Sequence, residues 1–358
     1  MEIAFRTNGS SAIGLGHVMR CMTLAEMLRQ FYNAEIQFWI NIDMPDAMVH
    51  ELKSSGFEVH RVMSAWNGEH IDQVQDANAC IQILQNSEQL DLIIVDHYGL
   101  DQRWEVILKP YCRRLMVIDD LANRKHSCHM LLDQNLSPNM ELRYAGLVSN
   151  TCMKLIGPSY ALLRQQFYAY KNVNRQCELC RHVLISFGGS DPTSETLKVL
   201  DAIEFNRISF MDIAFTVVAG PANPKATSIQ ERCNSLPNVT YLSSISNMAE
   251  LLNETDLAIG AGGISIWERA FMGVPSLVIS VASNQIEAVL EGAHKGLLVY
   301  VGNSENVGPN DIAIALSDII SDSEMRKNMS YACREMMHKL IYGEIHPILS
   351  GINNIWEV

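Results

Sequence analysis

The stretch FRTNGSSAIGLGHVMRCMTLAEML, residues 5–28, decides the fold class of the chain. It reads as the end of a strand, then a loop rich in glycine and serine, then an amphipathic helix. Such a loop offers backbone N–H groups to an anion, and the first turn of the following helix offers more. This loop also carries an ionisable side chain, because His17 follows directly after its last glycine, Gly16.

The same order of strand, loop and helix recurs along the chain. In the first half, short β-rich runs predict strands at 2–7, 35–40, 58–62, 92–95 and 115–118, with two more apolar runs within 130–157. In the second half, they predict strands at 182–187, 213–219, 239–242, 257–259 and 276–279. Helical patterns lie between the strands and end the chain at 309–321 and 323–340. Near-continuous apolar strands separated by helices indicate parallel sheets covered on both faces.

The chain is long enough for two domains of ordinary size, since it has 358 residues. The polar segment 171–181 has no clear periodicity and is the expected linker. We therefore predict two Rossmann-like α/β domains, 1–170 and 182–358, whose parallel sheets face a central cleft. The last helices are expected to pack back on the N-terminal domain. Ligands of open parallel sheets bind outside the carboxyl ends of the strands.

Composition excludes several classes of function. A formal net charge of −13 argues against nucleic acid as a partner. No apolar run approaches the roughly 20 residues of a membrane helix, and the first residues lack the pattern of a signal peptide. Nine cysteines without a framework spacing indicate reduced thiols and a cytoplasmic location. Cys177 and Cys180 have no second pair to complete a zinc site and no His-x-His partner pattern, so we interpret them as a structural or incidental pair. We expect no cofactor. We expect a monomer, because no heptad repeat stands out.

Three further loops stand at predicted strand ends: FGGSDPTSET from Phe187, GAGGISIWERA from Gly260 and SVASNQIEAVL from Ser280. Their glycines allow close backbone approach to a diphosphate. The helix after the first of these loops is expected to be capped near Thr193 or Ser194. The dinucleotide fingerprint G-x-G-x-x-G fails in the chain, and the P-loop and H-E-x-x-H motifs do not occur. The absence of these three motifs argues against a dehydrogenase, a P-loop enzyme and a zinc protease.

Two interpretations of His17 are open, a structural imidazole bonded to a backbone carbonyl and a general base. We favour the base, because the loop is of a ligand-binding type and a neutral imidazole near pH 7 accepts a proton from water. Asp96, His97 and Tyr98 end a predicted strand on the same side of the sheet. We expect one or two of them to face the ligand and the others to serve packing or capping.

Polar residues of the second half also have two interpretations each. Glu268 either pairs with Arg269 or lies on a solvated helix face, or else it accepts hydrogen bonds from sugar hydroxyls, as acidic residues do for nucleotide riboses. Asn284 and Gln285 either cap a helix or contact a diphosphate or sugar. The residues alone do not decide between these alternatives.

At these positions the sequence resembles the UDP-2,4-diacetamido-2,4,6-trideoxy-β-L-altropyranose hydrolases of pseudaminic acid biosynthesis. The matching stretches are RTNGSSAIGLGHVMRCMTLA, IVDHYGLD, LLRQQF, ISFGGSDPTSETLKVL and GAGGISIWERAFMGVPSLVI with NQ following. The resemblance implies a GT-B-like fold and metal-independent, inverting hydrolysis of the anomeric C–O bond, which releases UDP and the free 6-deoxy sugar. It also implies a role in a pathway that supplies flagellin glycosylation.

The resemblance further implies site residues, with His17 as general base and Glu268 as the ribose ligand. The other expected substrate contacts are Arg6, Asn8, Gly14, Gly16, Tyr98, Gly188, Gly189, Ser190, Gly262, Gly263, Ile264, Asn284 and Gln285. Asn8 departs from the family pattern, which usually has an acidic residue at this position. The alternatives are a GT-B glycosyltransferase with a UDP-sugar donor, a UDP-sugar 2-epimerase and a non-catalytic UDP-sugar-binding protein.

Overall fold

The computed structural model describes residues 1–9, 15–64, 71–84, 89–173, 175–220, 223–243 and 245–356. The chain divides into two compact units. The first comprises residues 1–135, 139–162 and 345–358, and the second comprises residues 136–138 and 163–344. The segment expected to be a linker, 171–181, belongs to the second unit, and the last residues of the chain belong to the first.

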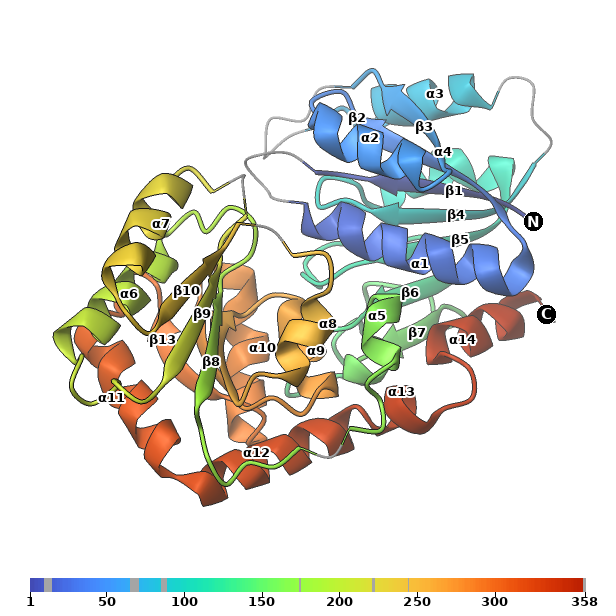
Figure 1. The fold of residues 1–358 in the computed structure, drawn as a ribbon. Helices are drawn as coiled ribbons and strands as arrows, with labels where there is room; N and C mark the ends of the chain where they lie inside the picture. Colours follow the sequence, from blue (N-terminus) through green and yellow to red (C-terminus); the bar gives the residue numbers. More distant parts are fainter. Residues whose placement is uncertain are drawn as a thin grey trace. The chain divides into compact units, whose positions relative to one another are not determined.

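The first unit is built on a fully parallel sheet with the strand order β3-β2-β1-β4-β5-β6-β7 (Figure 1). Its strands are β1 Glu2–Thr7, β2 Glu35–Asn41, β3 Glu58–Val62, β4 Leu90–Asp96, β5 Cys112–Ile118, β6 Met130–Asp133 and β7 Met153–Ile156. Its helices are α1 Gly16–Tyr32, α2 Asp46–Ser54, α3 Gln73–Ile83, α4 Gln102–Leu108 and α14 Pro347–Trp356, with 3₁₀ turns η1 Lys109–Tyr111 and η2 Pro158–Tyr160.

The second unit repeats this architecture with the strand order β10-β9-β8-β11-β12-β13, again all parallel. Its strands are β8 His182–Ser186, β9 Ala214–Val218, β10 Val239–Leu242, β11 Leu257–Ala261, β12 Ser276–Ser280 and β13 Val299–Asn303. Its helices are α5 Gln165–Tyr168, α6 Glu195–Phe205, α7 Ala226–Ser235, α8 Met248–Asn253, α9 Ser265–Phe271, α10 Ser283–His294, α11 Pro309–Ser321, α12 Ser323–Met336 and α13 His338–Tyr342.

The predicted fold class is confirmed, with two local differences. Strand β13 was not predicted, because it is a short edge strand whose residues are all half-buried, so it shows no apolar run. The helix predicted over 323–340 is divided at Met337, where the backbone leaves helical geometry with ψ 8°. Within the described residues, every helix is too short or too polar to span a lipid bilayer.

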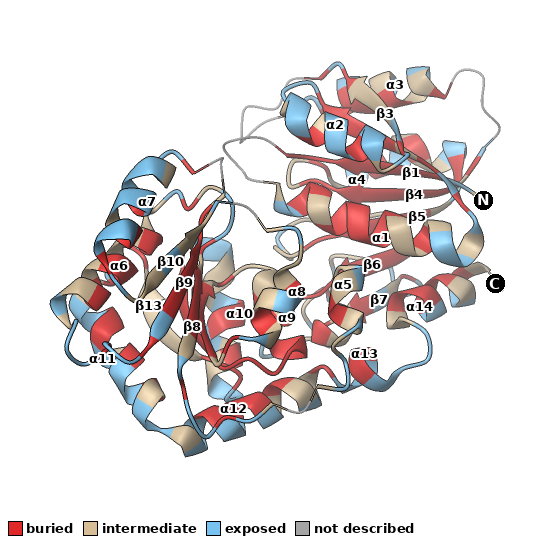
Figure 2. Cartoon of the chain, viewed as in Figure 1, coloured by how far each residue is buried: buried red, intermediate tan, exposed pale blue. Residues whose placement is uncertain are grey.

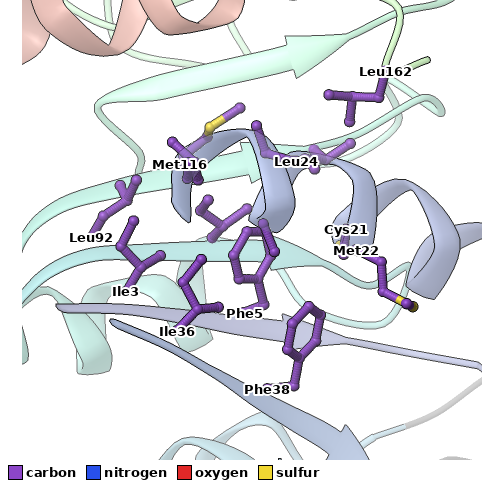
Figure 3. Close-up of a cluster of buried hydrophobic side chains, with 14 of the residues drawn as sticks. Ile3, Phe5, Cys21, Met22, Leu24, Ile36, Phe38, Leu92, Met116 and Leu162 are labelled. Atoms are coloured by element: carbon purple, nitrogen blue, oxygen red, sulfur yellow. The ribbon is translucent and has the colours of Figure 1, made fainter. Parts of the chain in front are cut away.

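Alternation along β1 assigns its side chains to the two faces of the first sheet. Ile3 and Phe5 lie in the hydrophobic cluster under α1, where Phe5 stacks on Phe38 of β2 with ring centroids 5.0 Å apart (Figure 3). Ala4 lies in the cluster on the opposite face. The strands of both sheets are largely buried and the outer faces of their helices are exposed, as Figure 2 shows. This packing fixes where α1 begins relative to the carboxyl ends of β1 and β4.

Candidate active site

The carboxyl edge of the first sheet brings His17 and Asp96 together. His17 is the second residue of α1, and Asp96 is the last residue of β4, level with Thr7 at the end of β1. Nδ1 of His17 lies 2.5 Å from Oδ1 of Asp96, and both side chains are buried. A carboxylate at this distance assigns the imidazole proton to Nδ1 and leaves the lone pair on Nε2. Within the described residues, no hydrogen bond engages that Nε2 atom.

Arg20 completes this contact from the same face of α1, one turn after His17. Its Nε donates to Oδ2 of Asp96 and its Nη2 to Oδ1, both at 2.5 Å. Its Nη1 donates to Oδ2 of Asp120 at 3.0 Å, just after β5. Burial alone would raise the pKa of Asp96, but the charge of Arg20 and the hydrogen bonds from Arg20 and His17 hold it well below its usual range. Asp96 is therefore a permanent anion next to His17.

Tyr98 and His97 follow Asp96 and point to different surroundings. The Tyr98 ring packs edge-on against the His17 ring, with centroids 4.4 Å apart, and its Oη donates to Oδ2 of Asp120 at 3.3 Å. Burial and the charge of Asp120 raise the pKa of Tyr98, which keeps the phenol neutral. His97 is buried, and its Nδ1 accepts a hydrogen bond from the backbone N–H of Gly99. Burial and Arg6 hold the pKa of His97 well below its usual range, so it is neutral.

Two expected substrate contacts, Arg6 in β1 and Asn8 directly after it, are buried within the first unit. Arg6 is fully buried on the face of β1 away from α1, where Nε and Nη2 bind both carboxylate oxygens of Asp76 at 3.0 and 2.6 Å. Its Nη1 donates to Oδ1 of Asn41 at 2.7 Å. Asn8 is only 1% exposed. Both side chains are buried within the first unit, and their roles as substrate contacts stay predictions.

The remaining expected residues of this loop are glycines. Gly16 is the first residue of α1, and a Cβ built there would meet no atom of the described residues within 4 Å. Gly14 lies outside the described residues. The residues that sequence reasoning missed are Arg20 and Asp120. Arg20 follows His17 by three positions, which places both on one helix face, and Asp120 follows a neighbouring predicted strand.

In the second unit, the loop after β8 has an open backbone. Gly188 has φ +85°, and a Cβ on Gly188 or Gly189 would meet nothing within 4 Å. Ser190 follows these two glycines and is half-buried. The carboxylate of Asp191 accepts from the backbone N–H groups of Glu195 and Thr196 at 2.9 Å each. The cap expected near Thr193 or Ser194 is therefore supplied by Asp191, and the first amides of α6 are already satisfied.

The loop after β11 is tied to the loop after β12 by a single amide. Oε1 of Gln285 accepts from the backbone N–H of Gly262 at 3.2 Å and from that of Val281 at 3.0 Å. A Cβ on Gly262 would lie 2.5 Å from Cγ2 of Val289, so only glycine fits. The N–H of Gly262 and the Oε1 of Gln285 are therefore bonded to each other rather than available to a ligand. Gly263 and Ile264 follow Gly262 and lead into α9.

Glu268 has a partner that its sequence neighbourhood did not suggest. Its Oε1 accepts from Nε and Nη2 of Arg164 at 3.0 and 2.9 Å, whereas Arg269 donates to Ser265 and to the carbonyl of Ala261. The Glu268 side chain is 12% exposed. Burial raises the pKa of Glu268 against the opposing charge of Arg164. The alternative of an ion pair with Arg269 is thus wrong, and Arg164, which lies in LLRQQF, binds the Glu268 carboxylate instead.

Asn284 lies in the exposed first turn of α10. The thiols of Cys177 and Cys180 are buried and not joined in a disulfide. Among the described residues, no three His, Cys, Asp or Glu side chains are grouped so that they hold a metal ion.

Comparisons with known proteins identify a matching domain family and several relatives of the chain. Residues 183–342 match the Glycosyltransferase family 28 C-terminal domain. The chain is 28% identical over 287 residues to the uncharacterized protein MJ1062 of Methanocaldococcus jannaschii, covering 78% of this chain and 55% of that protein. It is 27% identical to the spore coat polysaccharide biosynthesis protein SpsG of Bacillus subtilis, over 95% of this chain and 92% of that protein.

A UDP-2,4-diacetamido-2,4,6-trideoxy-β-L-altropyranose hydrolase of Campylobacter jejuni is 24% identical, over 86% of this chain and 94% of that protein. Among solved structures, MurG of Acinetobacter baumannii superposes with a TM-score of 0.63 at 11% identity, covering 95% of this chain and 97% of that chain. The fold is therefore GT-B, and the resemblance to the altropyranose hydrolases is confirmed as homology along most of the chain.

Proposed function

We propose that this relative of the altropyranose hydrolases hydrolyses UDP-2,4-diacetamido-2,4,6-trideoxy-β-L-altropyranose, releasing UDP and 2,4-diacetamido-2,4,6-trideoxy-L-altrose. The observation that carries the proposal is the buried pair of His17 and Asp96, with Nδ1 and Oδ1 2.5 Å apart. An imidazole held in one tautomer by a carboxylate is a general base. The substrate comes from the name of the Campylobacter jejuni relative.

In the proposed reaction, Nε2 of His17 takes a proton from a water molecule. The water oxygen forms a bond to the anomeric carbon as the bond from that carbon to the β-phosphate oxygen breaks, and the electron pair leaves with UDP. Attack from the face opposite the leaving group inverts the anomeric configuration. Asp96 fixes the ring and stabilises the imidazolium that forms. Tyr98 packs on the same imidazole and is the proposed sugar contact of this unit.

The second unit is proposed to bind UDP. Glu268 would accept hydrogen bonds from the ribose hydroxyls, and the two guanidinium contacts to its Oε1 make Arg164 a positioning residue. The open backbone of Gly188, Gly189 and Ser190, with Gly263 and Ile264, would contact the diphosphate and uracil.

Gly262 and Gln285 are proposed to shape that site through their mutual hydrogen bond, while Asn284 remains a proposed contact. The proposal needs no metal and places the reaction in the cytoplasm, in line with nine free thiols.

The test is product analysis in ¹⁸O-labelled water without any acceptor. Attack at the anomeric carbon places one ¹⁸O in the sugar and none in UDP, and proton NMR of the first product shows the inverted anomer. Label in UDP would place the attack at phosphorus and refute the mechanism. UDP release that starts only when a sugar or lipid acceptor is supplied would identify a glycosyltransferase instead.

A further inference from the structure

The Asp96 carboxylate next to His17 is shared with a second, permanently charged group. Oδ1 of Asp96 accepts hydrogen bonds from both Nδ1 of His17 and Nη2 of Arg20, each at 2.5 Å. The two nitrogen atoms lie 3.0 Å apart. Since His17 donates its Nδ1 proton to Asp96, the nitrogen–nitrogen approach is not a hydrogen bond but a close contact between a cation and the imidazole. The Arg20 side chain is 7% exposed, so water screens this contact little.

The surrounding charges show what Arg20 balances. Asp96 and Asp120 are two carboxylates, and Arg20 bridges them through Oδ2 of each. A second guanidinium lies at Asp120, because Nη2 of Arg143 donates to its carbonyl oxygen at 3.1 Å. Tyr98 and His97, which follow Asp96 in the same loop, are neutral by the pKa shifts given above. Burial and Asp96 raise the pKa of the Cys21 thiol on α1, so it is neutral as well. The adjoining residues 10–14 contain no ionisable side chain.

Without Arg20, the buried imidazole would face the Asp96 carboxylate with no guanidinium bound to that carboxylate. An opposite charge within about 4–6 Å favours the charged form of a titrating group by about 1–3 pH units. An opposite charge that no other cation shares favours the imidazolium form, and an imidazolium has no lone pair with which to accept a proton from water. A His–Asp pair without Arg20 is therefore less suited to the proposed role of base.

We propose that Arg20 is a positioning residue that keeps His17 neutral at neutral pH by sharing the Asp96 carboxylate with it. This inference rests on the proposed role of His17 and adds that the strength of the base is set by Arg20. The bidentate contact has a second effect, because it fixes the carboxylate plane and hence the orientation of the imidazole.

The experiment follows the protonation of His17 directly. The chain has 11 histidines, so the His17 signal is assigned by its loss in His17→Gln, in NMR spectra of the full chain with ¹³C-labelled histidine. Titration compares wild type, Arg20→Gln and Arg20→Lys, with Arg103→Gln as the matched control, since Arg103 is an exposed arginine of the same unit.

Arg20→Gln is expected to raise the His17 titration midpoint by about 1–3 pH units. The acid limb of kcat/KM should move to higher pH by the same amount, because a larger fraction of the base is protonated at each pH. Arg20→Lys keeps the positive charge, so its His17 midpoint should lie close to that of wild type. Arg103→Gln should leave the midpoint unchanged. A rise in KM with an unmoved midpoint would make Arg20 a ligand contact and overturn the inference.

A second variant covers the case in which Arg20→Gln does not fold. Asp120→Asn removes a negative charge instead, so it should move the His17 midpoint in the opposite direction, to lower pH. An upward shift or none in this variant would equally contradict the charge balance. The NMR readout separates the two hypotheses, because full activity of His17→Ala would refute the proposed base, whereas an unmoved midpoint would refute the role of Arg20 alone.

Discussion

The carboxyl ends of the two sheets carry different chemical groups. In the first unit, ionisable side chains are buried and bonded to one another, with Asp96 in contact with both His17 and Arg20. In the second unit, the loops present glycines instead. The backbone at Gly188 has free space beside it among the described residues, and the backbone at Gly262 is tightly packed.

Proton transfer needs side chains whose charge is controlled by neighbours, whereas binding of a diphosphate needs a backbone that a ligand can approach closely. The comparison indicates that the first unit supplies the proposed chemistry and the second supplies the proposed binding. Substitutions in the first should therefore change turnover and pH dependence, and substitutions in the second should change affinity and local packing.

The largest effect is expected from Asp96→Asn. The amide keeps the shape but no longer fixes the Nδ1 proton, so the imidazole loses its tautomer and kcat should fall by about 10²–10⁴-fold. The affinity for UDP, measured by calorimetry, should stay within about twofold. Asp46→Asn is the control, because Asp46 is an exposed aspartate that also pairs with an arginine. A variant with wild-type kcat and an intact thermal transition would exclude Asp96 from the reaction.

The buried charges of the first unit should also make its stability depend on pH. Nδ1 of His126 lies 2.6 Å from Oε1 of Glu105, with both side chains inaccessible. Burial opposes the charge, but the nearby carboxylate of Asp119 and the hydrogen-bonded carboxylate of Glu105 raise the pKa of His126 from 6.5 to about 9. A folded pKa above the unfolded one gives stability that is complete below pH 6.5 and lost as the pH rises through 9.

The loss of unfolding free energy across that window should be about 3 kcal/mol at 1.36 kcal/mol per pH unit. Urea denaturation at pH 6 and pH 9.5 measures it in wild type and His126→Gln. The variant should lack this part of the pH dependence, while the exposed His50→Gln should retain it. If the unfolding free energy falls equally between pH 6 and pH 9.5 in wild type and His126→Gln, the charged pair of His126 and Glu105 is contradicted.

In the second unit, Glu268→Gln should weaken UDP binding by about 10–100-fold, since a hydrogen bond to a charged group contributes about 1.5–3 kcal/mol. At saturating substrate, kcat should change little, which is the reverse of the result for Asp96→Asn. Glu231→Gln is the control, because Glu231 is an exposed carboxylate of the same unit. If kcat falls while the Kd for UDP is unchanged, the division of roles between the units is wrong.

The smallest effect concerns packing. Gly262→Ala should cost about 1–3 kcal/mol of unfolding free energy, because its Cβ would lie 2.5 Å from Cγ2 of Val289. Gly16→Ala should change it by about 0.5 kcal/mol or less, since no atom lies within 4 Å of that Cβ. Chemical denaturation of both variants measures the difference. Equal stabilities would show that the close packing at Gly262 is not required.

Sequence reasoning reached the fold and the position of His17 because both depend on local patterns. Strands and helices follow from periodicity, and a histidine that begins a helix after a glycine loop must lie at the strand ends. It did not foresee the partner of Arg6, because alternation in β1 turns this side chain away from the face that packs on α1, toward Asp76. That alternation is visible in Ile3 and Phe5 and indicates the face on which Arg6 lies.

Other features required contacts between distant positions. Glu268 pairs with Arg164, 104 residues earlier, and Gly262 is bound by Gln285, 23 residues later. No periodicity links such positions, so the sequence offered only the neighbour Arg269 as a partner for Glu268. Arg20 was within reach of sequence reasoning through its spacing from His17, whereas its bridge to Asp120 depends on the order of strands β1, β4 and β5 in the sheet.

The most direct test of the central claim is UDP release without an acceptor by wild type and His17→Ala, with UDP affinity measured on the same samples. A general base contributes about 10²–10⁴-fold to the rate. The account predicts rapid release by wild type, a loss of kcat in that range in the variant and an unchanged Kd for UDP. Equal turnover by the two proteins, both folded, would contradict it.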